Sequence, residues 1–414
     1  MRTIVTFSPR LQESKLLSKN NLDYLESENI SEAIIFSTYQ EDGSNLLSNE
    51  MSEIGINSSI LKMPELTTKG LEHSEQLKET AWKIVNNLFL EISKISEPLI
   101  YLGRGTRLHD HLLWLVGNIV GAKLAHWEKG PISSIDVNFD YFNSKLSPKI
   151  LSNLIDLAAE NKLTNGTEKY WFESKDIATI DSSIQLSGVQ AAAKVGLEKG
   201  FLEIDRTRTP PLYRLKKSGI PVGINNLVKH RTVGNKKMLI SFGRLNPELK
   251  TINMLRYFNK IEPHDSSFFI LQLIENEVDT SGVFSLSEII EIPEFKSLHE
   301  QTARCYEIIK KKSKYEEFNI IDPLFIVNPQ LENEDLEYSF YSKIINHIRE
   351  YELQHGDHVW TIDITSCMSS ISYLASELSI ASDSKISYVL KSKEGFGPSG
   401  TEIEESPFSR ADHV

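Results

Sequence analysis

The centre of the chain contains the stretch LSGVQAAAKVGLEKG at residues 186–200, followed directly by FLEID and, after RTRTPP, by LYRL. Ser187 and Gln190 have the spacing of a capping box, and Gly200 follows the last apolar residue of the pattern. The stretch therefore predicts a helix that begins at Ser187 and ends before Gly200. Val189, Ala192, Ala193 and Leu197 share one face of this helix. The residues of the opposite, free face are Ser187, Gln190, Ala191 and Lys194.

The segments after this helix predict a β-hairpin. Residues 201–205 and 212–215 are short and largely apolar, and the basic, proline-containing segment 206–211 separates them. A helix followed by such a hairpin is typical of a winged helix-turn-helix, which we expect over residues 146–218, with a supporting helix over 148–162.

A winged helix of this kind has side chains suited to double-stranded DNA. Gln190 suits adenine, and Lys194 suits guanine or a phosphate. We expect the wing cations to contact the DNA backbone or the minor groove; they are Arg206, Arg208 and Arg214. The alternative is a winged helix that serves only packing or dimerisation, because a fold alone does not determine a function.

The charge distribution favours DNA. Residues 145–237 contain 12 lysines and 4 arginines against 9 carboxylates, a net charge of +7, whereas the whole chain carries −12. Cations concentrated in one module are what phosphate binding requires, and acidic flanks limit adhesion elsewhere.

Both flanks alternate short apolar runs with longer amphipathic segments. In residues 1–145 the expected strands lie at 4–7, 33–36, 59–62, 99–102 and 123–126, with a long helix over 73–94. This order predicts a parallel sheet covered by helices, a Rossmann-like domain.

The second flank, residues 236–393, repeats the order of the first. Its expected strands lie at 237–244, 267–271, 319–327, 359–364 and 385–390, and a long helix is expected over 336–353. The predicted fold class is therefore α/β, with two Rossmann-like parallel-sheet domains flanking a central winged helix. Residues 219–235, rich in Gly, Pro and Asn, are expected to be a linker, and residues 394–414 a flexible tail.

A candidate anion site lies in the first flank, where Gly103-Arg104-Gly105-Thr106-Arg107 follows an expected strand. Two glycines let a ligand approach the backbone, and Thr106 can cap the next helix, whose N-terminus favours anions. Ser8-Pro9-Arg10 ends the first strand and is expected to open into the same crevice. Arg10, Arg104 and Arg107 would then face phosphate charge. A plain tight turn is the alternative.

The remaining composition is that of an intracellular protein of two or three domains. The start of the chain lacks a secretory core, and the most apolar helical stretch, residues 112–120, is too short for a bilayer, so we expect a cytoplasmic protein without a membrane partner. Cys305 and Cys367 are expected to be ordinary buried thiols, and no metal site or cofactor is predicted.

The strand, Gly-Arg-Gly-Thr-Arg turn and helix resemble the CRISPR-associated Rossmann fold (CARF) domain, and with the winged helix the chain resembles CARF-HTH transcriptional regulators of CRISPR loci. The resemblance implies an antiviral sensor whose effector is a cyclic oligoadenylate, with cyclic tetra-adenylate the expected ring. It also implies ligand loops at Ser8 to Arg10 and Gly103 to Arg107, with second-copy counterparts. These counterparts are Gly243, Arg244, Thr365, Ser366, Cys367, Met368 and Ser369.

The second copy departs from the pattern, because its turn has no glycine and its backbone cannot approach phosphate as freely. A chain with one reading helix needs a partner to bind a palindromic site, so we expect a homodimer. Two other functions stay open. One is a metal-independent ring nuclease that aligns a ribose hydroxyl with the scissile phosphate. The other is a winged-helix regulator with an unrelated nucleotide effector, or none.

Overall fold

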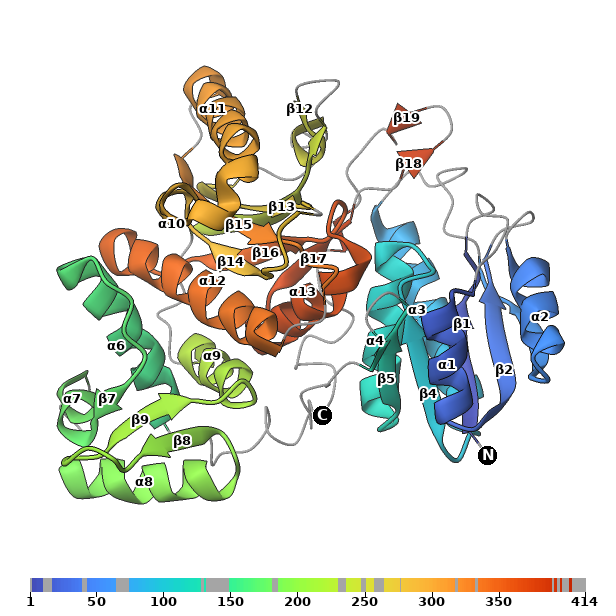
Figure 1. Ribbon diagram of the computed structural model, residues 1–414, viewed down its shortest axis with the longest axis horizontal. Helices are drawn as coiled ribbons and strands as arrows, with labels where there is room; N and C mark the ends of the chain where they lie inside the picture. Colours follow the sequence, from blue (N-terminus) through green and yellow to red (C-terminus); the bar gives the residue numbers. More distant parts are fainter. Residues whose placement is uncertain are drawn as a thin grey trace.

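The computed structural model describes residues 2–9, 17–38, 43–64, 74–127, 130–131, 149–180, 185–229, 236–246, 251–256, 264–275, 277–316, 319–331, 334–388, 391–392, 395–396 and 402–403. The chain is an α/β protein with two large, mainly parallel sheets and a small antiparallel one. Figure 1 shows the two large sheets on either side of the helices α4 (Arg107–Ile119) and α13 (Ser369–Ala381), with the small sheet and the helices around it at the lower left.

The first large sheet has the order β3-β2-β1-β4-β5-β6 and is parallel except for β6. Its central strands are buried on both faces, which explains their continuous apolar runs. All five strands expected in this flank are present. The strands are β1 (Arg2–Phe7), β2 (Ile30–Ser37), β3 (Asn57–Lys62), β4 (Pro98–Leu102), β5 (Lys123–His126) and β6 (Gly130–Pro131), and the helices are α1 (Lys19–Ser27), α2 (Ser44–Glu53), α3 (Ser74–Ile92) and α4 (Arg107–Ile119).

The second large sheet has the order β14-β15-β13-β10-β16-β17-β20. Its strands are β10 (Lys237–Gly243), β13 (Ser266–Leu273), β14 (Gly282–Phe284), β15 (Asn319–Val327), β16 (Val359–Asp363), β17 (Lys385–Ser387) and β20 (Glu402–Ile403). Its helices are α10 (Leu286–Glu291), α11 (His299–Glu316), α12 (Glu334–His355) and α13 (Ser369–Ala381), with 3-10 segments η1 (Asn253–Arg256) and η3 (Pro293–Leu298). Short pairs are formed by β11 (Leu245–Asn246) with β12 (Thr251–Ile252), and by β18 (Lys391–Ser392) with β19 (Gly395–Phe396).

The two large sheets share one topology. In each unit the order of the strands across the sheet is third, second, first, fourth, fifth. A further, antiparallel strand pairs with the fifth. The second sheet adds only β14 at its edge. The helices that follow the fourth strands, α4 and α13, each span 13 residues. The repeated order expected from the sequence is therefore present in the structure.

The central module joins four helices to the three-stranded antiparallel sheet β7-β9-β8. The expected hairpin is present as β8 (Leu202–Asp205) and β9 (Leu212–Leu215). The other elements are α6 (Ile150–Asn165), β7 (Phe172–Glu173), α7 (Ser174–Ile180), α8 (Leu186–Glu198) and α9 (Gly219–Lys229).

The start of α8 differs from the prediction. The residue with extended backbone before the helix is Gln185, which makes no side-chain cap, so Ser187 lies inside the first turn and the capping box is absent. The end of the helix is as expected, because Gly200 has a φ of +75°. A sequence pattern gives the periodicity of a helix more reliably than its first residue.

The linker predicted over 219–235 is wrong for residues 219–229, which form the buried helix α9. Pro221 lies in the first turn, where its missing N–H removes no helical hydrogen bond. Ile220, Ile224 and Leu227 are buried against the core. Gly223 lies so close to α6 that a Cβ there would come within 3.0 Å of the Leu151 carbonyl oxygen. Gly223 and Pro221 thus allow a helix to pack closely here and do not mark a loop. Residues 230–235 lie outside the described part.

The flexible tail predicted over 394–414 is also partly wrong. Glu402–Ile403 pairs antiparallel with β17, and Gly395–Phe396 pairs with Lys391–Ser392. The remaining residues of this segment lie outside the described part of the chain.

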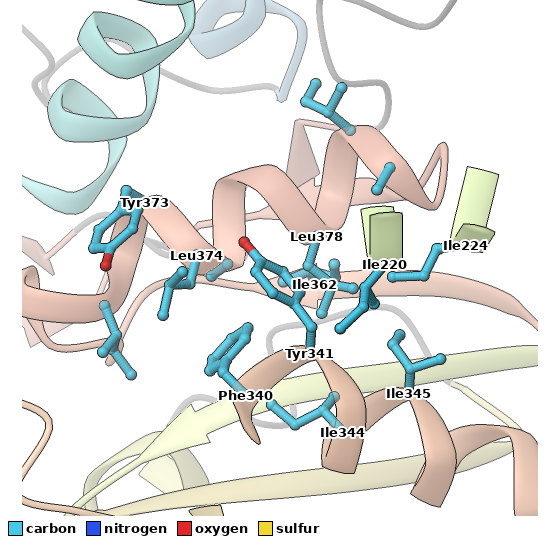
Figure 2. Close-up of a cluster of buried hydrophobic side chains, with 14 of the residues drawn as sticks. Ile220, Ile224, Phe340, Tyr341, Ile344, Ile345, Ile362, Tyr373, Leu374 and Leu378 are labelled. Carbon is cyan, nitrogen blue, oxygen red and sulfur yellow. The ribbon is translucent and has the colours of Figure 1, made fainter. Parts of the chain in front are cut away.

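The two α/β units pack on each other through α4 and α13 (Figure 1). Every residue of α13 is buried, as are ten consecutive residues of α4, Leu108 to Gly117. The core that surrounds them is continuous through both units and the central module. Figure 2 shows part of it, where Ile220 of α9, Tyr341 of α12 and Leu378 of α13 belong to one cluster.

A carboxyl group lies inside this core. Glu377 of α13 is 3% exposed and accepts a hydrogen bond from the Tyr341 hydroxyl through Oε2, while its Oε1 has no hydrogen-bond partner among the described residues. Burial raises the pKa of Glu377 to about 7, against the bond from Tyr341 and the charge of Lys217, which lower it. The folded chain therefore holds a proton on Glu377 that the unfolded chain releases above pH 4.5.

We expect Glu377→Gln to remove a pH dependence of stability. A folded pKa above the unfolded one stabilises the fold at low pH, and this stabilisation falls as the pH rises from about 4.5 to about 7. Relative to the parent chain, the variant should gain roughly 3 kcal/mol between these pH values. Urea unfolding of both proteins at pH 4.5 and pH 8 measures the gain. An equal difference at both pH values would contradict a protonated, buried Glu377.

Candidate functional site

The first candidate turn, residues 103–107, joins β4 to α4 and has a constrained backbone. Gly103 has a φ of +104°, and a Cβ on it would lie 2.5 Å from Nε2 of His126. A Cβ on Gly105 would lie 2.7 Å from the His109 Cβ. Both glycines are therefore required by close approach and, at Gly103, by backbone conformation. Thr106 caps α4 as expected, because its Oγ1 accepts the His109 N–H at 3.3 Å.

The neighbouring predicted ligand residues line the same edge of the sheet. The Arg104 guanidinium lies 4.7 Å from the centre of the Trp127 ring. Ser8 and Pro9 are buried, and the Ser8 N–H donates to the Phe36 carbonyl at 2.9 Å. Arg10 lies outside the described residues. The Arg104 guanidinium therefore stacks on an aromatic ring of its own α/β unit.

Arg107 has a different place from the one expected for a phosphate ligand. Its Nη1 lies 3.1 Å from Oδ2 of the buried Asp110, whose Oδ1 accepts the Gly103 N–H at 2.9 Å. Its Nε donates to the Cys367 carbonyl at 2.7 Å, in the turn of the other α/β unit. Arg107 thus joins the two candidate turns to each other, and 22% of its side chain is exposed.

The second candidate turn, residues 364–368, joins β16 to α13. It contains no glycine and is held by hydrogen bonds from side chains. Asp363 accepts the Thr365 N–H at 3.1 Å and the Ser241 hydroxyl at 2.7 Å. Gln272, at the end of β13, accepts the Met368 N–H at 2.6 Å and donates to the carbonyls of Gly243 and Ser366.

These bonds occupy donors that an anion would need. The Thr365 and Met368 N–H groups are bonded to side chains, and the Cys367 N–H donates to the Ile364 carbonyl. Ser366, Cys367, Met368 and Ser369 are buried. In the first turn the Gly103 and Thr106 N–H groups are bonded as well, to Asp110 and His109, so the second turn differs from the first in its lack of glycine.

The other predicted residues of the second unit lie at the end of β10. Gly243 is buried, and a Cβ there would lie 2.8 Å from atoms of Ile252 and Met254. Arg244 is exposed, and its N–H donates to Oδ1 of Asn253 at 2.8 Å. Of the second-copy residues, Arg244 is the cation that solvent reaches.

Two buried groups of this region do not carry charge at neutral pH. Burial raises the pKa of the Cys367 thiol to about 12, so it is not a ready nucleophile. Burial lowers the pKa of His111 in α4 to about 4, and neither ring nitrogen has a hydrogen-bond partner among the described residues. Among the described residues, no group of three His, Cys, Asp or Glu side chains is arranged to hold a metal ion.

The surface of α8 matches the expected division into two faces. Val189 and Ala193 are buried, and Ala192 and Leu197 are half-buried. The four residues expected to face DNA are exposed; they are Ser187, Gln190, Ala191 and Lys194. Arg206 and Arg208, at the hairpin tip, are also exposed.

Arg214 is placed differently from the other predicted DNA contacts. Its guanidinium lies 4.7 Å from the centre of the Trp171 ring and 5.1 Å from that of Tyr338 on α12, and its Nη2 lies 2.5 Å from Oε1 of Glu203. These contacts hold it against the second α/β unit.

Sequence reasoning missed Asp110, Gln272 and Asp363. Asp110 carried a detectable signal, because it stands three residues after Arg107 in the first turn of a helix. Asp363 stands at the end of β16, two residues before Thr365, which is the spacing of a local side-chain bond to a turn, whereas Gln272 carried no signal because only the sheet brings the end of β13 near the turn.

No family model and no curated protein matches the chain. The crystal structure of protein VC1899 from Vibrio cholerae aligns over 84% of this chain and 98% of that one, at 9% sequence identity and a TM-score of 0.21. A score this low supports no argument about fold or function. No helix in the described residues has the length and apolarity needed to cross a membrane.

We expect Gly103→Ala to destabilise the chain more than Gly121→Ala. Both glycines have positive φ, but a Cβ on Gly121 has no atom within 4 Å. The control should therefore lose about 1 kcal/mol from its backbone conformation alone, and Gly103→Ala should lose that and the cost of displacing His126. Urea unfolding measures both losses, and equal losses would contradict the close packing of the first turn.

Proposed function

We propose that this chain is a DNA-binding transcriptional regulator whose DNA affinity depends on a cyclic oligoadenylate, as the resemblance to CARF-HTH regulators of CRISPR defence suggests. The observation that carries the proposal is the bond from Arg107 to the Cys367 carbonyl, which joins the turns of two repeated units. Such a junction offers two related walls to one ligand, and a ring of repeated nucleotides has matching repeats.

The first turn supports phosphate binding. It ends a parallel strand and leads into the N-terminus of α4, whose dipole favours an anion. Arg104 and the exposed Arg244 add positive charge from the two units. We propose that the first turn binds a phosphate and that the second, which has no glycine, serves as a wall.

The central module supports DNA binding as a winged helix-turn-helix. In this proposal α8 enters the major groove with Gln190 and Lys194, and the hairpin tip contacts the backbone with Arg206 and Arg208. Arg214 does not belong to this surface, because it packs on α12. One chain supplies one such helix, so we propose that two chains bind a palindromic site as a homodimer in the cytoplasm.

The effector is tested by titration calorimetry of the chain with cyclic tetra-adenylate and cyclic hexa-adenylate. We expect one ring to bind, and Arg104→Gln to weaken its binding about tenfold or more, because a charge-assisted contact to phosphate is lost. Arg2→Gln, at the opposite end of the sheet, is the control and should bind as the parent does.

Two results would overturn this assignment. If neither ring binds, the chain is a DNA-binding protein with another effector or none. If the recovered ligand is linear, the chain is a ring nuclease.

The DNA surface is tested by the salt dependence of binding to a duplex selected by the full chain from a random library. Replacing Arg206 and Arg208 together by Gln should lower the slope of log K against log salt by about 2, because each phosphate contact contributes about 0.9. Lys310→Gln on α11, exposed and outside the module, should leave the slope unchanged. Equal slopes for both variants would remove the hairpin from the DNA interface.

A further inference from the structure

The hairpin of the central module is fastened to the first turns of α12. The guanidinium of Arg214 on β9 lies over the ring of Trp171 and over that of Tyr338, which belongs to α12. Two residues after β9, Lys217 forms an ion pair with Oε2 of Glu337, the residue before Tyr338. The strand that leaves the hairpin tip is thus held at two neighbouring points of one helix.

The same glutamate is bonded to α13. The Tyr373 hydroxyl donates to Oε1 of Glu337, so one oxygen of this carboxylate faces the central module and the other faces α13. Tyr373 is 4% exposed and Glu337 is 8% exposed. A buried carboxylate between two fixed partners cannot lose either without a cost, because a bond of this kind is worth most where water is excluded.

Tyr373 lies one helical turn after the second candidate turn. It stands four residues after Ser369, the first residue of α13, and Arg107 holds Cys367 just before that helix. At its other end α13 also meets the central module, because the Asn225 side chain of α9 donates to the Ala381 carbonyl at 3.2 Å. A shift of α13 of about 1 Å is enough to break a hydrogen bond unless the partner follows.

We propose that Glu337 and Tyr338 are positioning residues that couple the ligand crevice to the DNA-binding hairpin. The proposal rests on the proposed function and names its internal connection: a ligand between the two turns displaces α13, Tyr373 draws Glu337 with it, and Lys217 and Arg214 transmit the change to β9 and α9. Neither residue contacts ligand or DNA. They act on the orientation of the module.

The test compares Tyr373→Phe with Tyr341→Phe. Each variant removes one buried hydroxyl from a bond between α12 and α13. Tyr373 bonds to Glu337, the ion-pair partner of Lys217, whereas Tyr341 bonds to Glu377, on which Lys217 acts through its charge alone. The measured quantity is the ratio of DNA dissociation constants with and without saturating cyclic tetra-adenylate, on the library-selected duplex. We expect Tyr373→Phe to bring this ratio about three- to tenfold closer to one, the equivalent of one buried hydrogen bond, and Tyr341→Phe to preserve it.

A second readout does not depend on the ligand. In the free protein, amide hydrogen exchange over residues 212–229 should quicken in Tyr373→Phe and in Lys217→Met, and stay at the parent rate in Tyr341→Phe. If the parent fails to bind the ring, the proposed effector is wrong, and exchange alone then decides the coupling. If Tyr373→Phe leaves the ratio of DNA dissociation constants unchanged, or if its amide hydrogen exchange equals that of the parent, the proposed role of Glu337 is overturned.

Discussion

The contact between α4 and α13 is the constraint on which the rest of the structure depends. α13 is buried on every side, so its own sheet cannot cover it, and α4, α9 and α12 complete the cover. This requirement brings the two α/β units together within one chain and attaches the central module to the second unit. It also places the turns that precede α4 and α13 next to each other, where the Arg107 guanidinium joins them.

The two units share a topology but stabilise their turns by different means. Gly103 and Gly105 permit the first turn, and the Asp110 carboxylate holds it. The second turn has no glycine and depends on Asp363, at the end of its own strand β16, and on Gln272, near the end of β13. A repeated fold has therefore produced an asymmetric pair of walls, and in our proposal the first holds charge while the second sets shape and reports movement to the module.

The sequence predicted the strands, the repeat and the two faces of α8, because alternation and helical periodicity are local properties. It did not predict α9, where buried Gly, Pro and Asn residues imitate a loop. It also gave no sign of the partners of Arg107 and Arg214. Each was expected to meet phosphate, but the partners that engage them, Cys367 and Tyr338, lie more than 100 residues away. Charge in a sequence gives no indication of such partners, and only the packing of helices brings them together.

The central claim is that both walls of the ligand crevice belong to one chain. Native mass spectrometry of the protein with cyclic tetra-adenylate measures the number of rings per chain most directly. We expect one ring for each chain, and so two rings in each homodimer. One ring shared by two chains would show that the crevice forms between chains, and would contradict the pairing of α4 with α13 as the basis of ligand binding.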